Sequence, residues 1–162
     1  MLIALLSDTH DSVANTQAAL ALLVPHRPAA YLHAGDLVST SMLDLFIGLP
    51  FHFVFGNNEY DHAELRSRAL ALGLTCHGQQ ADLTLGPARI CLTHGHDGRL
   101  SRAARSGDFT YIIHGHTHVR RDERVGKTRI INPGAVQRAS VRSVALLNVA
   151  TDELRFLELT RT

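Results

Sequence analysis

Five short polar clusters hold the side chains of this sequence that could do chemistry. In chain order they are Asp8-Thr9-His10, Gly35-Asp36, Gly56-Asn57-Asn58-Glu59, Thr93-His94-Gly95-His96 and Gly115-His116-Thr117-His118. Mixed nitrogen and oxygen donors without a thiolate suit Mn, Fe, Ni, Co or Zn and disfavour Ca. Two Asp and at least four His exceed the needs of one tetrahedral ion. They match two ions roughly 3.5–4 Å apart that share a carboxylate, an arrangement used for phosphoryl chemistry.

The composition points the same way. The chain has 162 residues with 11 His, 2 Cys and no Trp, and His is the commonest metal ligand near neutral pH. Cys76 and Cys91 are too few for a disulfide framework, so free thiols are expected. Apolar residues make up 45% and charged residues 19%, which is typical of a soluble globular protein and excludes a disordered or fibrous one.

Each cluster follows a short apolar run of strand length. These runs are Leu2–Leu6, Tyr31–Ala34, Phe51–Phe55, Ala88–Thr93 and Tyr111–His114. Helical patterns at about residues 13–24, 41–47 and 61–72 alternate with the early runs, which predicts a largely parallel sheet with helices on its faces. Functional groups gather beyond the carboxyl ends of the strands in such sheets.

The second half is more antiparallel in character. A hairpin is expected from residues 81–85 and 88–93, and further strands are expected at residues 129–131, 144–149 and 154–159. The whole pattern predicts one α/β domain over residues 1–162, built from two sheets with mixed parallel and antiparallel strands.

The ordered clusters resemble the calcineurin-like metallophosphoesterase superfamily, whose hallmarks are D-x-H, G-D, G-N, H or G-H, and G-H-x-H. They run from residue 8 to residue 118, and Asn132-Pro133-Gly134 extends the resemblance over almost the whole chain. The family continues that last motif with Ser, whereas Ala135 stands here, so we assign no hydroxyl contact to it. The resemblance implies an α-β-β-α sandwich without a cap domain, similar to the small single-domain phosphodiesterases.

The same resemblance implies a site with two divalent transition-metal ions, with Mn favoured over Fe, Ni, Co or Zn. The implied ligands are Asp8, His10 and His118 for the first ion, Asn57, His94 and His116 for the second, and Asp36 as the bridge. A water or hydroxide activated by the two ions would attack phosphorus in line. The implied reaction is hydrolysis of a small phosphodiester, with monoesters as a further substrate class.

Two positions bear on acid catalysis. Asn58 stands where the related protein phosphatases carry a His that protonates the leaving group, and an amide has no such proton to give. We therefore expect a preference for good leaving groups. His96 is the other catalytic candidate, and two roles stay open for it: acid or phosphate donor, or brace for His94.

Charge is unevenly distributed although the formal net charge is only +1. Residues 1–98 hold 4 Arg and 9 acidic residues, whereas residues 99–162 hold 12 basic and 6 acidic residues. Among these cations, Arg99 and Arg138 are candidates for binding a phosphate ester, since guanidinium forks match phosphate oxygens. The remaining histidines are expected to be packed, as at His33 and His114, or to lie at the surface or at helix ends.

Two other functions use the same features. A nuclease would exploit the arginine excess, so nucleic acid stays open as a partner, and a metal-free scaffold subunit would use the fold alone. The opening segment lacks a basic start, and no apolar run approaches the roughly 20 residues of a membrane helix. We therefore expect a cytoplasmic protein without a membrane partner, and self-association into a homo-oligomer stays open.

Overall fold

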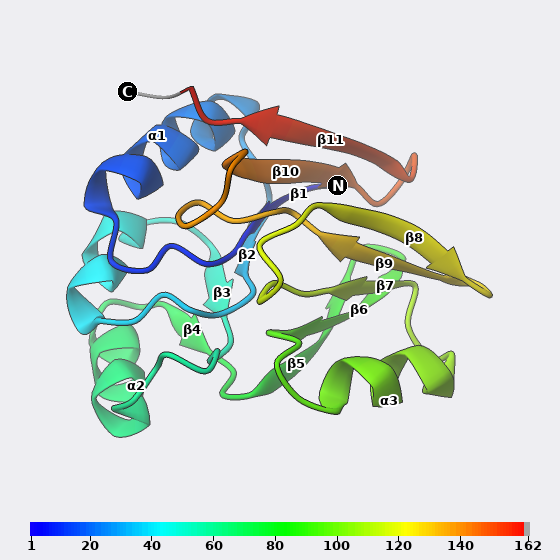
Figure 1. The fold of residues 1–162 in the computed structure, drawn as a ribbon, viewed down its shortest axis with the longest axis horizontal. Helices are drawn as coiled ribbons and strands as arrows, with labels where there is room; N and C mark the ends of the chain where they lie inside the picture. The colour runs from blue at the N-terminus through cyan, green and yellow to red at the C-terminus, as the bar shows by residue number, and fades with distance from the viewer. Residues whose placement is uncertain (161–162) are drawn as a thin grey trace.

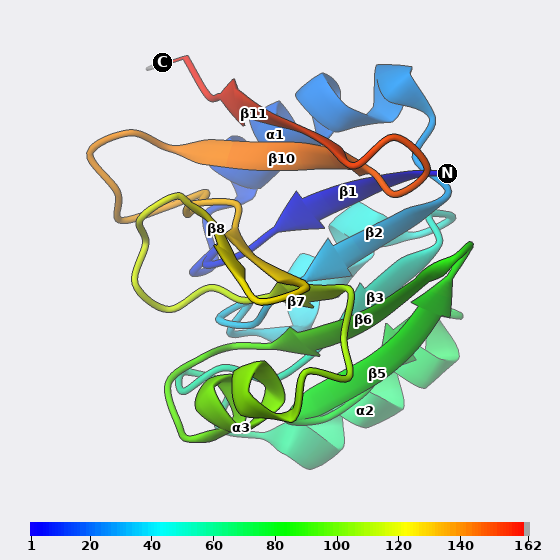
Figure 2. The same ribbon diagram turned by 90° about the vertical axis from the view of Figure 1, so that its right-hand side faces the viewer.

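Two β-sheets pack face to face, and helices cover both outer faces, so that the layers run α-β-β-α (Figure 1). The computed structural model describes residues 1–160. Turned by 90°, the molecule shows α3 in front of the second sheet and α1 and α2 behind the first (Figure 2). The predicted α/β class with two mixed sheets is confirmed. None of the helices within residues 1–160 has the length and apolar character that a bilayer span needs.

The first sheet has the strand order β11-β10-β1-β2-β3-β4. Its parallel strands are β1 (Leu2–Leu6), β2 (Ala30–His33), β3 (Phe51–Phe53) and β4 (Thr75–Cys76). Two antiparallel strands, β10 (Ser143–Asn148) and β11 (Glu153–Glu158), complete the other edge. The parallel half therefore comes from the first part of the chain, as the alternation of strands and helices predicts.

The second sheet has the order β5-β6-β7-β9-β8. Its members are β5 (Gln80–Leu85), β6 (Ala88–Thr93), β7 (Tyr111–Ile113), β8 (Arg121–Val125) and β9 (Thr128–Asn132). Strands β6, β7 and β9 are parallel, and an antiparallel strand lies at each edge. The predicted hairpin of β5 and β6 is confirmed, with Ala81 opposite Leu92.

The helices divide between the two outer faces. The first sheet is covered by α1 (Val13–Leu23), α2 (His62–Ala71) and the 3-10 helix η2 (Thr40–Phe46), while a 3-10 turn, η1 (Val24–His26), continues α1. Helix α3 (Arg99–Ser106) covers the second sheet through Ala103. Helix α2 begins after Asp61, whose carboxylate accepts the Glu64 N–H at 2.8 Å and so satisfies one free amide of the first turn.

Strand β1 explains why the sequence opens with a continuous apolar run. Successive side chains of a strand point to opposite faces. Ala4 and Leu6 therefore pack beneath the helices, while Ile3 and Leu5 pack against the second sheet. Both faces of β1 are buried, so no position in the strand favours a polar residue. The same packing on both faces fixes the carboxyl end of the strand, after which Asp8 follows.

Three elements were not predicted from the sequence. Strand β8 carries the charged run Arg121–Val125 and lies at a sheet edge, where charged side chains are tolerated because one side has no neighbouring strand. Helix α3 is rich in Arg and Ser, and Ala103 is its one buried residue. Strand β4 has only two residues. Strands β4 and β8 lack the apolar period that reveals an element in a sequence, whereas the apolar stripe of α3, formed by Leu100, Ala103 and Ala104, spans only about one helical turn.

Candidate metal centre

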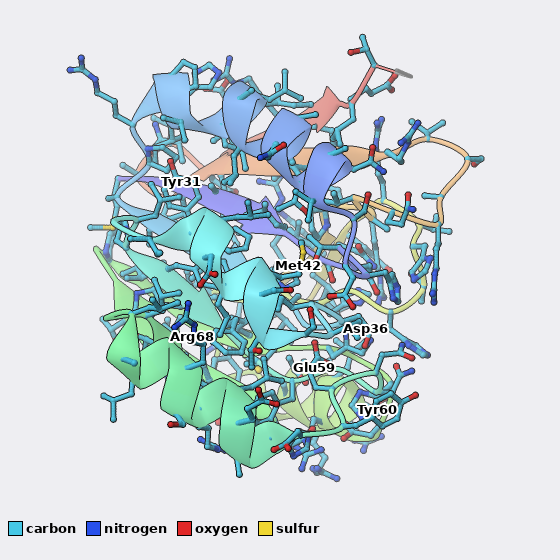
Figure 3. The ribbon with its side chains drawn as sticks, turned by 90° about the vertical axis from the view of Figure 1, so that its left-hand side faces the viewer. Tyr31, Asp36, Met42, Glu59, Tyr60 and Arg68 are labelled. Carbon is cyan, nitrogen blue, oxygen red and sulfur yellow. The ribbon has the colours of Figure 1, made fainter. Side chains whose placement is uncertain are left out.

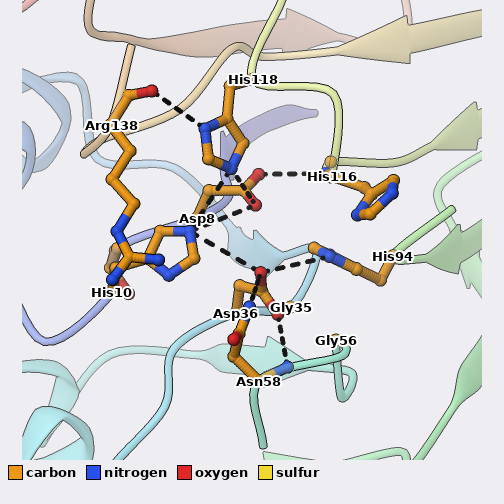
Figure 4. A network of polar contacts seen from close by, with 12 residues as sticks. Asp8, His10, Gly35, Asp36, Gly56, Asn58, His94, His116, His118 and Arg138 are labelled. Carbon is orange, nitrogen blue, oxygen red and sulfur yellow. Dashed lines mark hydrogen bonds and ion pairs between the residues drawn. The ribbon is translucent and has the colours of Figure 1, made fainter. Parts of the chain in front are cut away.

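The polar clusters meet at one edge of the two sheets, beyond the carboxyl ends of β1, β2, β3, β6 and β7 (Figure 4). The structure brings together all seven positions that the resemblance implies as ligands: Asp8, His10, Asp36, Asn57, His94, His116 and His118. Asp8 and His94 are fully buried, whereas Asn57 and His116 are exposed. The cluster therefore has a buried floor and a rim that solvent reaches.

The first ligand group consists of Asp8, His10 and His118. His118 Nε2 lies 3.2 Å from Asp8 Oδ1 and 3.3 Å from His10 Nε2. His10 Nε2 lies 3.6 Å from Asp36 Oδ2. Four donor atoms thus face a common point between the ends of β1, β2 and β7.

The second ligand group consists of Asn57, His94 and His116. Asn57 Oδ1 lies 3.1 Å from His94 Nε2 and 3.1 Å from His116 Nδ1. His94 Nε2 lies 3.5 Å from Asp36 Oδ2, the same oxygen that faces the first group. Asp36 is therefore placed between the two groups, where one carboxylate can serve both.

Strained backbone coincides with the ligands. Five of the seven have a positive φ, namely Asp8 (57°), His10 (42°), Asp36 (58°), His116 (67°) and His118 (58°). The left-handed conformation costs roughly 1–2 kcal/mol for a residue with a Cβ, and such residues gather at functional sites. The strain turns these side chains back toward a shared centre instead of letting them continue along the strand direction.

Two backbone carbonyls fix the orientation of ligand imidazoles. His94 Nδ1 lies 2.7 Å from the Ala34 carbonyl oxygen, and His118 Nδ1 lies 3.0 Å from the Arg138 carbonyl oxygen. A carbonyl only accepts hydrogen bonds, so both rings carry a proton on Nδ1 when they are neutral. Their Nε2 lone pairs then point into the cluster, as metal-ligating histidines require.

The donor set fits a cation. With Nε2 unprotonated, His118 presents a lone pair to Asp8 Oδ1, a buried oxygen that has no hydrogen-bond partner among the described residues. Donors about 2.1 Å from one ion stand roughly 3.0–3.4 Å apart at octahedral to tetrahedral angles, close to the spacings within both groups. A proton on His118 Nε2 could be donated to Asp8, and this favourable interaction raises the pKa of His118 despite burial. The carboxylates thus attract positive charge to the position where the lone pairs converge.

Asp36 is held in its ionised form. Burial by itself would raise the pKa of this carboxyl, but His94 and Asn58 hold the pKa well below its usual range. The Asn58 side-chain amide donates to Asp36 Oδ2 at 2.7 Å, and the Asn58 backbone N–H donates to Oδ1 at 3.0 Å. In the structure, therefore, the side chain of the catalytic candidate Asn58 orients the Asp36 carboxylate.

His96 and the two arginine candidates lie around the cluster. The His96 ring stands 5.4 Å from the His94 ring and 6.2 Å from the His116 ring, and no hydrogen bond joins His96 to His94 within residues 1–160. Arg99 forms an ion pair with Asp97. Arg138 is exposed, with its guanidinium beside His10 (Figure 4). Of the two arginines, Arg138 lies at the ligand cluster, and no carboxylate within residues 1–160 forms an ion pair with it.

Two residues without an assigned role in the sequence hold the ligand loops. The Glu59 carboxylate accepts backbone N–H groups from both the Asp36 and the Asn57 loops. The Asn132 amide donates to the Gly115 carbonyl oxygen at 2.9 Å and to Thr117 Oγ1 at 3.1 Å, so it holds the loop that carries His116 and His118. Each stands inside a motif that the sequence singled out, but only contacts with distant residues reveal its role.

His33 and His114 are packed, as expected. His33 Nδ1 accepts the Gly35 N–H at 3.2 Å, so its neutral ring carries the proton on Nε2 and donates to Thr9 Oγ1 at 3.2 Å. His33 therefore makes two hydrogen bonds, and it joins the first two ligand loops. His114 Nδ1 lies 3.0 Å from the Gly115 carbonyl oxygen. Burial lowers the pKa of each ring to about 4.

These two buried rings predict a pH-dependent stability. An unfolded histidine titrates near 6.5, so between pH 6.5 and 4 the unfolded chain binds protons that folded His33 and His114 refuse, and stability falls as pH falls. When the pH falls from 6.5 to 5, each ring lowers the free energy of unfolding by about 2 kcal/mol. His94 and His118, whose pKa values are raised, contribute with the opposite sign. The free energy of unfolding of metal-free His114→Gln, measured with urea, should therefore fall by about 2 kcal/mol less than that of the wild type over this interval.

The matched control is His26→Gln, since His26 is exposed at the end of η1. This variant should keep the wild-type difference between pH 6.5 and pH 5. An identical pH response of the His114→Gln and His26→Gln variants would contradict the argument.

The other histidines have local contacts. His52 Nδ1 and His77 Nε2 lie 3.1 Å apart, so His77 pairs with His52 and not with the neighbouring Cys76. His62 begins α2 and stacks on Phe55, with ring centroids 4.0 Å apart. Cys76 and Cys91 are free thiols, as expected.

An open hollow of about 270 Å³ adjoins the ligand cluster. Its lining residues are His118, Val119, Arg120, Ser140, Val141 and Glu158. Two exposed valine side chains, Val119 and Val141, provide apolar wall, and Arg120 pairs with Glu158 at 3.0 Å. The hollow gives an organic group room beside a ligand histidine.

An α-β-β-α sandwich with carboxylates, imidazoles and one carboxamide converging at its strand ends defines the class of metal-dependent phosphoesterases. A family model, the calcineurin-like phosphoesterase superfamily domain, matches residues 1–152. The chain belongs to this superfamily. The match covers every ligand position named above.

Individual relatives agree with this assignment. The phosphodiesterase MJ0936 of Methanocaldococcus jannaschii is 29% identical over 138 residues, which cover 83% of each chain. The structure of an archaeal phosphodiesterase superimposes with a TM-score of 0.91 at 26% identity, covering 98% of this chain and 100% of its own. The zinc complex of Vps29 from Entamoeba histolytica has a TM-score of 0.71 at 23% identity over 99% of this chain and 100% of its own, and shares the fold.

Proposed function

We propose that this protein is a metal-dependent phosphodiesterase that uses two divalent transition-metal ions, with manganese favoured. The observation that carries the proposal is the position of Asp36 Oδ2, which lies 3.6 Å from His10 Nε2 and 3.5 Å from His94 Nε2. One carboxylate oxygen thus faces both ligand groups. Imidazole with carboxylate and carboxamide oxygens suits manganese and its neighbours in the first transition row.

Each ligand group has a distinct task in this proposal. Asp8, His10 and His118 would hold one ion, Asn57, His94 and His116 would hold the other, and Asp36 would serve both. Two ions bound in this way lower the pKa of a water molecule and neutralise charge on a transferring phosphoryl group. The buried Asp8 and Asp36 keep the site anionic without the ions, while exposed Asn57 and His116 leave the side of substrate entry open.

Substrate binding is assigned to the rim. Arg138 is exposed beside His10, and its guanidinium would bind phosphoryl oxygens. His96 is assigned the substrate-side role of acid or phosphate donor, because its ring faces the rings of His94 and His116 without a hydrogen bond to His94 within the described chain. The hollow beside His118 would take one ester group of the substrate.

Phosphodiesters are the proposed substrate class for two reasons. The Asn58 amide is committed to Asp36 and has no acidic proton for a leaving group, so esters with good leaving groups should react fastest. The relative from M. jannaschii and the archaeal structure are both described as phosphodiesterases.

The test is a metal-by-substrate activity matrix on protein stripped with chelator. The substrates are bis(p-nitrophenyl) phosphate, p-nitrophenyl phosphate and single-stranded DNA, each assayed with Mn²⁺, Ni²⁺, Co²⁺, Zn²⁺ and no metal. The diester should be hydrolysed only with added metal and fastest with Mn²⁺. Arg138→Met should raise KM for the diester, and Arg99→Met should leave KM near the wild-type value.

The matrix also separates the competing functions. Turnover of single-stranded DNA well above that of the small diester would replace the proposal with a nuclease. Absence of metal-dependent hydrolysis of every substrate would refute the enzyme and favour a scaffold protein with this fold.

A further inference from the structure

Glu59 is a buried carboxylate directly behind the ligand cluster. It is 4% exposed, and Figure 3 shows it close to Asp36, whereas the neighbouring Tyr60 points outward. Within residues 1–160 no arginine, lysine or histidine forms an ion pair with it. A charge buried without a countercharge is costly unless hydrogen bonds compensate it. The partners of Glu59 therefore indicate what the residue does.

Those partners are four backbone N–H groups from two loops. Oε1 accepts from Leu37 and from Val38, the latter at 3.1 Å, and Oε2 accepts from Asp36 at 3.2 Å and Gly56 at 2.6 Å. An ionised carboxylate offers about four lone-pair positions, so its full capacity is used. Three of the donors follow β2, and the fourth follows β3.

The loop after β2 needs such an acceptor. Gly35, Asp36 and Val38 have φ values of 95°, 58° and 88°, a left-handed path that departs from the β-ladder and turns three N–H groups inward. Buried N–H groups require partners, and Glu59 supplies them. The Gly56 N–H joins this arrangement from the second loop, one residue before Asn57. One carboxylate therefore sets the spacing between the loops that present Asp36 and Asn57.

The first ligand group also contacts the loop after β2, because the N–H groups of Asp8 and His10 donate to the Gly35 and Asp36 carbonyl oxygens at 3.0 Å, but it has further anchors away from Glu59 and from the loop after β3. The Asp8 carbonyl oxygen accepts the Gln137 N–H at 3.0 Å, and Asp8 Oδ2 accepts the His116 N–H at 3.1 Å. The His118 ring is held by the Arg138 carbonyl. These bonds tie Asp8 and His118 to the second sheet and to the loop before β10, so a displaced loop after β3 would leave them in place.

We propose that Glu59 is a positioning residue that controls the second ion by holding Asp36 and Asn57 at the spacing a shared site needs. This inference rests on the proposed two-ion site. Loss of the Glu59 charge should lower the affinity for the ion at Asn57, His94 and His116 more than the affinity for the ion at the first ligand group.

The test is Glu59→Gln in the full-length protein. The substitution keeps the side-chain volume, but its NH₂ group faces backbone N–H donors and leaves some of them without an acceptor. Metal-free protein is titrated with Mn²⁺ alone, and stoichiometry is followed by calorimetry and by the spin-coupled EPR signal of paired manganese. The wild type should bind two ions, and Glu59→Gln should bind the second about 10–100-fold more weakly. The paired signal should weaken accordingly.

Activity provides a second readout. At low Mn²⁺, Glu59→Gln should have a reduced kcat for the diester with little change in KM, and added Mn²⁺ should restore kcat. The matched control is Glu64→Gln, the same change at an exposed position on α2, which should behave as the wild type. Glu59→Asp keeps the charge and the acceptor atoms but shortens the side chain by one methylene, so its affinity for the second ion should fall between those of the wild type and Glu59→Gln. This variant also provides the test if Glu59→Gln does not fold.

Three results for Glu59→Gln would overturn the inference. The first is an equal loss of affinity for both ions, and the second is an unchanged affinity for the second ion. The third is a lowered thermal stability in chelator together with the wild-type stoichiometry of Mn²⁺ binding. The failure of the proposed function would look different. In that case the wild type would bind Mn²⁺ without hydrolysing any substrate, and the two-ion titration of the variants would still decide the role of Glu59.

Discussion

Asp36→Asn is expected to reduce kcat/KM for a phosphodiester by about 10³-fold while the protein stays folded, because the change removes the charge that faces both ligand groups. Asp36 Oδ2 lies within 3.6 Å of a donor atom in each group. Metal ions contribute several kcal/mol of charge stabilisation in a phosphoryl-transfer transition state, and a loss of about 4 kcal/mol corresponds to this factor. Asn keeps the shape of the side chain, so the change in charge dominates.

Binding should change for both ions at once, which distinguishes Asp36→Asn from substitutions within one ligand group. The measurement combines steady-state kinetics with Mn²⁺ titration, and circular dichroism in chelator checks the fold. The control is Asp11→Asn, which alters a carboxylate in a neighbouring loop whose partners are the N–H and hydroxyl of Ser39. Near-wild-type turnover of Asp36→Asn would contradict the two-ion site.

The second large effect is expected at Gly115→Ala, because Gly115 follows β7 and leaves no room for a Cβ against the residues that follow β1. A Cβ at this position would overlap Ser7 Oγ and stand 2.7 Å from Asp8 Oδ2, both buried at the end of β1. Overpacking of this kind typically costs about 1–3 kcal/mol. Relief requires the end of β7 to move away from β1, which would separate His116 and His118 from Asp8.

Gly115→Ala should therefore lose both stability and Mn²⁺ binding, as measured by urea unfolding and calorimetry. Gly107→Ala is the matched control. Gly107 ends α3 with a φ of 65° and has open space around its Cβ position, so alanine costs about 1–2 kcal/mol through backbone strain. This control should lose stability and keep both ions. Wild-type ion binding in Gly115→Ala would refute the argument from close approach.

Much of the fold could be predicted from the sequence because buried strands leave a simple pattern. The run Leu2–Leu6 is apolar at every position since both of its faces are covered, and β5 and β6 are separated by an evident turn. Strand β8 and helix α3 were missed because their outer faces are charged and few of their side chains are buried. Their position comes from the sheet and helix packing around them.

The sequence by itself determined which chemistry this protein carries: the Asp, Asn and His types, their order, and their place after strands are all local properties of the chain. It does not distinguish Arg138 from Arg99, because both are arginines beside a motif, and it does not show that His33 joins the first two ligand loops. The tertiary structure decided those cases through burial and through partners far away in the chain. Glu59 shows the physical reason most clearly, since its role consists of hydrogen bonds to residues 21–23 positions earlier. Contacts of this kind form only when β2 and β3 pair in the folded sheet.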